Sequence, residues 1–366
     1  MAFKKPSIKK TVTTLNSLRI YLRSVKKFGK STLFRDVVLS EYGDPEKGLL
    51  VGIGAEMGYA LLDSLNSTHI ETWKDLQELK TWLIKEKGNE HNIELVAFDV
   101  IDEIIPIVEK EVCRLSQIET GKPCKTINAA YNGYGKGQDK VKEMLKTYFF
   151  DLYKAGFGLF AIAHTKTKNI VEKGMEESEG YTTLTSNLSN SYEGVFGDIF
   201  DCVLTGMIDR EIIDGRTVGT TRKLFFRGDH YVDAGCRFSK GSVPEYMIFD
   251  SEDNAPEFIN ILKEGMRKSA KNPISEEEFN KRTIEEQNQL KENLKIAIEK
   301  ENKSEEIKEV EENIDNKDEL LSQIQNRMKS VGADARNKAI AFVKSRGGKT
   351  SEMEIEDLKE LFNILN

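Results

Sequence analysis

The chain has few of the residues that build disulfide frameworks and metal knuckles. Its 366 residues include four cysteines and four histidines, and no two cysteines have CxxC spacing. In a chain of this length, scattered cysteines indicate reduced thiols rather than a disulfide framework or a zinc site. The dispersed histidines also argue against a metal site built from imidazoles. The cysteines are Cys113, Cys124, Cys202 and Cys236.

Long apolar runs are also absent. The apolar stretches are much shorter than the roughly 20 residues that a membrane-spanning helix needs. The basic segment at residues 1–16 lacks the apolar core of a signal peptide. We therefore expect a cytoplasmic protein that does not enter a membrane. The net charge of −7 gives no general support for nucleic-acid binding, which would have to depend on a local basic patch.

Residues 17–255 alternate short apolar runs with longer amphipathic stretches. Apolar strands separated by helices are typical of a mainly parallel sheet that helices cover on both faces, so the sequence predicts an α/β core. The expected buried strands are residues 18–22, 49–55, 94–100, 158–164 and 201–207. A hairpin is expected after the last of these strands, with Asp214 and Gly215 as its turn.

The composition changes after the core. Residues 256–318 are dense in Glu and Lys with isolated Leu and Ile, which predicts a solvated helix or a partly disordered linker. A coiled coil is less favoured, because no heptad pattern persists. Apolar periodicity returns at residues 319–366, which we interpret as a small helical module. In that module Ser351 and Glu354 have the spacing of a capping box.

A phosphate-binding loop is the strongest motif. The general pattern GxxxxGK[ST] ends here in Gly29-Lys30-Ser31, after an apolar strand and before an expected helix that ends near Gly43. That context lets backbone N–H groups face phosphates while the lysine reaches the β/γ oxygens and the hydroxyl binds Mg²⁺. The candidate nucleotide-binding residues are Ser24, Val25, Lys26, Lys27, Phe28, Gly29, Lys30, Ser31 and Thr32.

The loop departs from the pattern at its first position, where Ser24 replaces glycine. Serine can make the same turn if its φ is negative, and the groups that touch phosphate and metal, Lys30 and Ser31, are intact. A functional variant loop is therefore favoured, and a degenerate loop with weak or no nucleotide binding is the alternative. A second tripeptide of this kind, Gly348-Lys349-Thr350, follows a basic helical stretch and no strand, so we do not expect it to bind phosphate.

Polar residues at the ends of three other strands are candidates for catalysis. Asp99 ends an apolar run in the manner of a carboxylate that holds Mg²⁺, although some strands end in Asp for no functional reason. Glu56 can polarise the attacking water as general base. His164 can contact the γ-phosphate or its water, or can be a structural strand-end residue. Asp102 and Glu103 are expected to cap the following helix.

Basic residues elsewhere in the sequence are further candidates for binding nucleotide or DNA. Arg227 and Arg237 can reach the nucleotide of a neighbouring subunit as trans-acting arginines, or can lie on a solvated sheet edge. Residues 128–140, rich in Gly, Tyr and Lys, are a candidate mobile loop that stacks on single-stranded DNA. They also suit an ordinary solvent loop.

With the strand ends in this order, residues 15–250 resemble the phage-encoded RecA-like P-loop ATPases, AAA-family ATPases of recombination and single-strand annealing modules. The resemblance depends on "SVKKFGKST", "LLVGIGAEMG", "LVAFDVIDE", "GLFAIAHTKTK" and "AGCRF". It implies a RecA-like core in which Lys30, Ser31 and Thr32 bind ATP. It also implies that Asp99 holds Mg²⁺, that Glu56 is the base and that His164 is the sensor.

The resemblance also implies a biological setting. Proteins of this kind act in phage DNA recombination, replication or repair, within the host cytoplasm, on single-stranded DNA or with a single-strand-binding protein. They assemble into a homo-oligomeric ring or filament. The alternative is a nucleotide-gated or inactive scaffold that docks a partner protein through its C-terminal helices. A packaging motor is disfavoured, because the Glu residues of the tail alternate with Lys instead of forming nuclease-like clusters.

Overall fold

The computed structural model describes residues 10–55, 61–171, 180–213, 216–250, 254–270, 272, 274–350 and 353–365. The chain divides into two compact units, and the division falls between Ala297 and Ile298. None of the helices in the described ranges is long and apolar enough to cross a membrane. The domain boundaries expected at residues 16, 255 and 318 stay a prediction.

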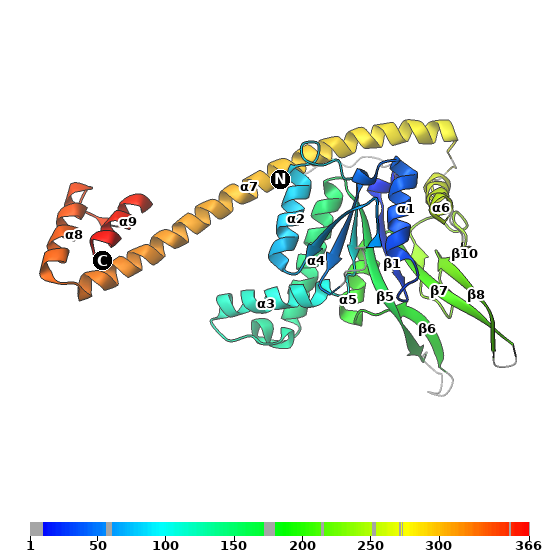
Figure 1. Cartoon of the computed structure of the whole chain (residues 1–366), viewed down its shortest axis with the longest axis horizontal. Helices are drawn as coiled ribbons and strands as arrows, with labels where there is room; N and C mark the ends of the chain where they lie inside the picture. The colour runs from blue at the N-terminus through cyan, green and yellow to red at the C-terminus, as the bar shows by residue number, and fades with distance from the viewer. Residues whose placement is uncertain are drawn as a thin grey trace. The chain divides into compact units, whose positions relative to one another are not determined.

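One sheet organises the first unit. Ten strands belong to it in the described residues, in the order β10-β8-β7-β1-β5-β4-β2-β3, with β6 beside β5 and β9 beside β7 (Figure 1). Six neighbouring strands, from β7 to β3 in this order, are parallel, and this confirms the predicted α/β fold with a mainly parallel sheet. The strands are β1 (Arg19–Ser24), β2 (Gly48–Ile53), β3 (Asn66–Ile70), β4 (Leu95–Asp99), β5 (Gly158–Ile170), β6 (Tyr181–Ser186), β7 (Cys202–Ile213), β8 (Arg216–Phe225), β9 (Gly235–Cys236) and β10 (Tyr246–Ile248).

Helices flank this sheet and form the second unit. Those within the first unit are α1 (Lys30–Tyr42), α2 (Trp73–Lys85), α3 (Ile104–Thr120), α4 (Lys136–Lys154), α5 (Asn190–Ile199) and α6 (Asn254–Lys268). Helix α7 (Glu276–Ser330) contains the division between the units, and α8 (Ala333–Ser345) and α9 (Ile355–Ile364) follow it. Most of the segment expected to be a helical or disordered linker is therefore helical, in α6 and α7.

Alternation along the central strand β1 assigns helices to the two faces of the sheet. Ile20 and Leu22 belong to a core cluster that also contains Phe34 of α1 and Phe258 of α6. Tyr21 points to the opposite face, where its ring lies 5.6 Å from that of Phe196 in α5. A buried strand needs apolar partners on both faces, and these two layers of helices provide them.

The five strands predicted from apolar runs are present as β1, β2, β4, β5 and β7. Strand β3 was not predicted. Its sequence, Asn66–Ile70, is polar and mostly solvent-accessible, since it lies at the edge of the sheet beside β2. An edge strand does not need a continuous apolar run, because one flank and much of one face contact water.

The hairpin expected after β7 is confirmed by the antiparallel pairing of β7 with β8. Its expected turn, Asp214-Gly215, lies outside the described residues, as does Ser351 of the expected capping box. Helix α1 ends as predicted at Gly43, whose left-handed φ of 64° lets its N–H bond to the Leu39 carbonyl.

The segment at residues 128–140 differs from the expected loop. A short 3₁₀ segment spans Ile127–Asn132 with a kink at Ala130 and Tyr131, and α4 begins at Lys136. Every residue from 131 to 135 has positive φ. The Gly- and Tyr-containing residues 131–135, part of the expected loop, thus make a compact turn between two helical elements.

The second unit has a small apolar core of its own. One buried cluster combines side chains from the C-terminal part of α7, from α8, and from α9 with the residues that flank it: Ile324, Ala339, Met353, Leu358, Leu361 and Leu365. Leu358 and Leu361 lie three residues apart on α9, the spacing that puts two side chains on one helix face. The apolar periodicity of residues 319–366 therefore has a structural counterpart.

Candidate functional site

The loop between β1 and α1 has the geometry of a phosphate-binding turn. Gly29 is the residue before α1, and its φ of 110° lies in a region that side chains rarely adopt. Helix α1 begins at Lys30, so the N–H groups of its first turn and its positive dipole end are directed at the loop. The glycine is needed here because the chain must turn left-handed to start the helix.

Ser24, which departs from the motif, is the last residue of β1. Its backbone pairs with His164 of β5 on one side and with Gly206 of β7 on the other, so it is extended. Within residues 24–29, all of which the structure describes, positive φ occurs only at Lys27 and Gly29. The Ser24 backbone thus meets the condition under which serine can replace glycine at no conformational cost.

Lys30 is buried behind the loop, with 7% of its surface exposed. Its Nζ lies 3.2 Å from Ser24 Oγ, 3.4 Å from the Ser24 carbonyl and 3.2 Å from the Val25 carbonyl. Three oxygens of the loop thus hold the ammonium close to the turn. A largely buried ammonium at this position is placed to attract an anion such as phosphate.

Phe28 does not enter the expected nucleotide pocket. Its ring is buried in the core and stacks on Phe249, with the ring centroids 4.8 Å apart and the planes 16° from parallel. A Cβ on Gly206 would lie 2.7 Å from this ring. Because Gly206 of β7 has no side chain, there is space for the Phe28 ring.

Ser31 and Asp99 are brought together. Ser31 lies in the first turn of α1, Asp99 ends β4, and the Ser31 hydroxyl donates a hydrogen bond to the Asp99 carboxylate. Asp99 is 5% exposed. Mg²⁺ favours hard oxygen ligands, retains waters and usually takes only one or two protein oxygens beside substrate phosphates. The Ser31 hydroxyl and the Asp99 carboxylate are therefore oxygen donors of the kind that would hold Mg²⁺.

A cavity of about 500 Å³ opens beside the loop and just beyond Asp99, although neither Ser31 nor Asp99 lines it. It lies where β1, β2 and β4 end and where the parallel pairing of β5 with β1 stops at His164, the edge at which parallel α/β sheets bind ligands. Its lining residues are Val25, Lys26, Ala55, Val100, Asp102, Glu103, His164, Thr165 and Asn187. The loop, the neighbour of Asp99 and the expected sensor histidine thus border a single space.

Glu56, the expected base, lies outside the described residues; its neighbour Ala55 lines the cavity. Glu103 contributes a second carboxylate that the sequence did not assign to the site. A Cβ on Gly54 would lie 3.2 Å from a Glu103 carboxylate oxygen, so this side chain covers the turn that follows β2. The cavity accordingly has an acidic side opposite the lysine-rich loop.

Asp102 binds His164, in the middle of β5, instead of capping a helix. Its carboxylate accepts hydrogen bonds from the His164 N–H at 2.9 Å and from the Asn187 side chain at 3.1 Å. The His164 Nδ1 lies 3.8 Å from the same carboxylate. Helix α3 begins at Ile104, and Glu103 makes no side-chain cap. The expectation that these two acids cap α3 was therefore wrong.

Arg227 and Arg237 are engaged within their own chain. The Arg227 guanidinium donates to the carbonyls of Cys236 at 2.8 Å and Phe238 at 2.6 Å. Arg237 forms an ion pair of 3.1 Å with Asp201, and its side chain is 55% exposed. Of the two, Arg237 is the one with a solvent-accessible head group, and a trans-acting role for either arginine stays a prediction.

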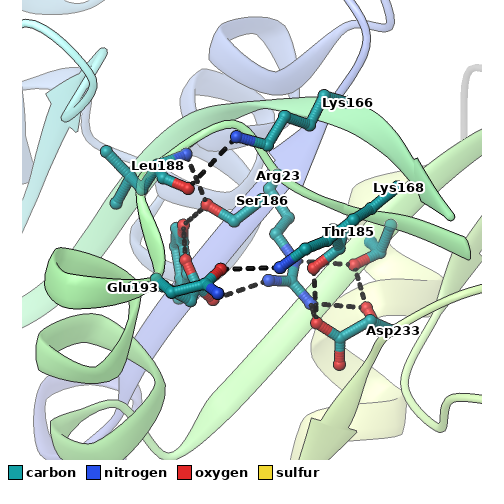
Figure 2. Close-up of polar contacts among 11 residues, drawn as sticks. Arg23, Lys166, Lys168, Thr185, Ser186, Leu188, Glu193 and Asp233 are labelled. Atoms are coloured by element: carbon teal, nitrogen blue, oxygen red, sulfur yellow. Dashed lines mark hydrogen bonds and ion pairs between the residues drawn. The ribbon is translucent and has the colours of Figure 1, made fainter. Parts of the chain in front are cut away.

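A buried ionic cluster lies directly before the loop, and the sequence did not indicate it. Arg23 is fully buried and donates to Glu193 Oε1 at 2.7 Å and to the Asp233 carbonyl at 2.6 Å. It also forms an ion pair of 2.7 Å with the Asp233 carboxylate. Figure 2 shows Glu193 and Asp233 directed at its guanidinium from opposite sides.

The same cluster includes Tyr21, two residues earlier on the same face of β1. Its hydroxyl bonds to Ser186 at 2.7 Å and donates to Glu193 at 3.0 Å. Burial, and then the negative charge of Glu193, raise the pKa of Tyr21 well above its ordinary value. The sequence contained one sign of this cluster, namely two arginines, Arg19 and Arg23, in a buried strand. Buried arginines require acidic partners.

The β5–β6 hairpin connects the cluster with the cavity. Thr185 of β6 donates to the Asp233 carboxylate at 2.8 Å. Lys166, two residues after His164, donates to the carbonyls of Asn187 and Leu188 (Figure 2). The base of the hairpin is thereby hydrogen bonded both to the end of β1 and to the wall of the cavity.

The chain was compared with protein families, with solved structures and with curated proteins. A family model described as an AAA domain matches residues 16–238, more than half of the chain, including the loop and the ends of β4 and β5. A solved KaiC-like protein from the hyperthermophilic archaeon Pyrococcus horikoshii is similar at 11% identity and a TM-score of 0.35. That similarity covers 64% of this chain and 90% of the other. No curated protein matches the chain.

Proposed function

This chain belongs to the AAA domain family of P-loop ATPases, and from that premise we propose that it is a Mg²⁺-dependent ATPase whose nucleotide lies at the carboxyl ends of β1 and β4. The hydrogen bond between Ser31 and Asp99 carries this proposal. It joins the first turn of α1 to the end of β4, the two elements whose oxygens hold Mg²⁺ in P-loop enzymes. A bound Mg²⁺ would neutralise phosphate charge that develops during transfer.

Phosphate binding falls to the loop. The N–H groups at the start of α1 and the Lys30 ammonium form a positive, partly desolvated cradle. Lys26 and Lys27 are exposed on the loop and add positive charge at its outer surface. Because Phe28 packs into the core, the loop can close around a triphosphate without displacing that ring.

Activation of water requires a carboxylate near the γ-phosphate, and we assign that role to Glu56. His164 would contact the γ-phosphate or the water from its place in β5 at the cavity wall. Support comes from Asp102, which holds the His164 backbone at the cavity wall. A change of phosphate state at His164 would then reach the β5–β6 hairpin directly, since Thr165 and Lys166 continue the same strand.

The biological role that we infer is phage DNA recombination, replication or repair, on single-stranded DNA or with a single-strand-binding protein, in a homo-oligomeric ring or filament. Its support is the resemblance of the loop and strand-end motifs, together with one surface. In the turn at residues 131–135 the Tyr134 side chain is 99% exposed, and Lys122, Lys125 and Lys136 nearby in sequence are also exposed. An exposed ring among lysines suits base stacking with backbone contacts.

The test is a steady-state ATPase assay with the full chain, with and without single-stranded DNA. We expect Mg²⁺-dependent hydrolysis that falls at least tenfold in Lys30→Ala and in Glu56→Gln. Glu46→Gln, outside the cavity, serves as the matched control and should keep wild-type turnover. Equal activity in wild type and both site variants would show that the hydrolysis comes from elsewhere. Nucleotide binding without any turnover would favour the scaffold alternative.

A further inference from the structure

The four cysteines, scattered in sequence, meet as two pairs in the structure. Cys202 begins β7 and Cys236 ends β9, and the two are direct partners in the antiparallel pairing of these strands. Cys113 of α3 and Cys124, just beyond the end of that helix, form the second pair through their thiols. All four are free thiols.

The Cys202–Cys236 pair has the backbone geometry of a disulfide. The adjoining pair is hydrogen bonded, because the Arg237 N–H donates to the Asp201 carbonyl at 2.8 Å. Hydrogen-bonded and non-hydrogen-bonded pairs alternate in an antiparallel ladder, so Cys202 and Cys236 form a non-hydrogen-bonded pair with Cα atoms about 4.5 Å apart. Disulfides span Cα separations of roughly 4.4–6.8 Å.

The two pairs have opposite electrostatic surroundings. The hydrogen bond from the Cys202 thiol, together with the nearby Arg227 guanidinium, lowers the pKa of Cys236 to about 7. Burial, the hydrogen bond with Cys124 and the Glu109 carboxylate raise the pKa of Cys113 to about 11. A thiolate is the reactive form of cysteine. At neutral pH the first pair therefore contains a nucleophile, and Cys113 is protonated.

Cys202 and Cys236 also differ in how accessible they are to solvent. Cys236 is partly exposed, whereas Cys202 is fully buried in the core beside Ile20 of β1. The Cys236 thiol packs against the core cluster and donates to the Phe226 carbonyl at 3.4 Å, and Cys236 is still the more accessible of the two cysteines. This is the arrangement of an attacking thiol and a resolving thiol.

We propose that Cys202 and Cys236 are a modification site, a dithiol that a hydroperoxide converts to an intramolecular disulfide joining β7 to β9. The Cys236 thiolate attacks one peroxide oxygen, the O–O bond breaks, and the departing alkoxide or hydroxide takes a proton. The resulting sulfenic acid is attacked by the Cys202 sulfur, the S–O bond breaks, and hydroxide leaves with the Cys202 proton as water. Two thiols lose two electrons and the peroxide gains them.

This site is independent of the nucleotide site, so its test needs no ATP. The full chain, reduced and freed of reductant, is treated with hydrogen peroxide at pH 7, then alkylated and mapped by mass spectrometry without reduction. We expect loss of two hydrogen atoms, a crosslinked peptide pair containing Cys202 and Cys236, and alkylated Cys113 and Cys124. The same treatment in denaturant should remove this selectivity, because only the folded chain aligns the pair.

A second measurement isolates the reactivity of each thiol. Iodoacetamide at pH 7 should modify Cys236 about 100-fold faster than Cys113, because the larger thiolate fraction outweighs the lower intrinsic nucleophilicity. Cys236→Ser should abolish the disulfide, and Cys113→Ser, the matched control, should leave it intact. Three results would overturn the proposal: faster oxidation of the Cys113–Cys124 pair, accumulation of sulfinic acid at Cys236 without a crosslink, or the same products in folded and denatured chains.

Discussion

The tripeptide GK[ST] occurs twice in this molecule, and the two copies have different structures. Gly29-Lys30-Ser31 follows a buried strand and begins a helix, and Lys30 is enclosed by carbonyls of the loop. Gly348-Lys349-Thr350 follows the end of α8, where the Gly348 N–H bonds back to Val343 and Lys349 is exposed. The same three residues thus begin a helix after a buried strand in one place and lie in a helix-terminating turn in the other.

The difference shows what the tripeptide needs from its surroundings. A phosphate cradle requires a strand that fixes where the loop starts, a helix N-terminus that supplies N–H groups, and a carboxylate from a neighbouring strand. The first copy has β1, α1 and Asp99. In the second copy the backbone N–H of Gly348 is already used by the preceding helix. The following predictions challenge this contrast, in order of decreasing expected effect.

The largest effect should come from the strand that supports the first copy. Arg23→Leu leaves Glu193 and Asp233 without their buried partner. Removing one member of a buried ion pair typically costs about 3–5 kcal/mol, and we expect the lower end, because the Glu193 and Asp233 side chains are 24% and 51% exposed. We expect the denaturant midpoint of the first unit, measured by tryptophan fluorescence, to fall accordingly. Arg210→Leu, an exposed residue of β7, should change stability by no more than about 0.5 kcal/mol. Similar midpoints for both variants would mean that the cluster is not stabilising.

The second prediction compares the two lysines directly. Lys30→Ala should reduce ATP turnover by about 10²–10³-fold, since a preorganised charge at the transferring phosphate is lost. Lys349→Ala should retain wild-type turnover. Parallel ATPase assays at saturating Mg²⁺ measure both. A loss of turnover in Lys349→Ala comparable with that in Lys30→Ala would contradict the contrast between the two copies.

The third prediction concerns Asp99, the carboxylate that contacts Ser31 of the first copy. Asp99→Asn keeps the size of the side chain but removes the charge that would hold Mg²⁺. The Mg²⁺ concentration needed for half-maximal ATP binding should rise by about 10–100-fold. Asp209→Asn, on β7 and paired with Lys223, is the control. An unchanged Mg²⁺ requirement in Asp99→Asn would remove the metal role from Asp99.

The smallest effect is expected at the position that departs from the motif. Ser24→Gly restores the general pattern, yet the Ser24 backbone is already extended within β1. We expect ATP affinity to change by less than about threefold and stability to fall by about 1 kcal/mol, since glycine weakens a strand interior and the hydroxyl contact with Lys30 is lost. A tenfold gain in affinity would show that serine impairs the loop.

Much of the fold and of the candidate site could be predicted from local sequence patterns. Strand β1, the loop and α1 are contiguous in sequence, so the motif and its context could be recognised together, and Asp99 ends a conspicuous apolar run. The edge strand β3 could not be found in the same way, because only its last residue, Ile70, is buried and the strand has no apolar run. Predictions from sequence succeed here where one segment contains the whole physical reason for its structure.

Groupings of distant residues could not be predicted. Arg23 contacts Glu193 and Asp233 only in the folded protein, where β1 pairs with β7 and α5 packs on the sheet. The cysteines offered no close spacing, yet the pairing of β7 with β9 aligns two of them. The cap expected from Asp102 failed for a similar reason, since the carboxylate bonds to His164 and Asn187, which come much later in the chain.

The most direct test of the nucleotide site is calorimetric titration of ATP into the full chain, with and without Mg²⁺. The account predicts saturable binding to one site per chain that needs Mg²⁺, disappears in Lys30→Ala and persists in Lys349→Ala. Absence of heat in the wild type, or equal binding by Lys30→Ala, would contradict the assignment of the nucleotide to the turn between β1 and α1.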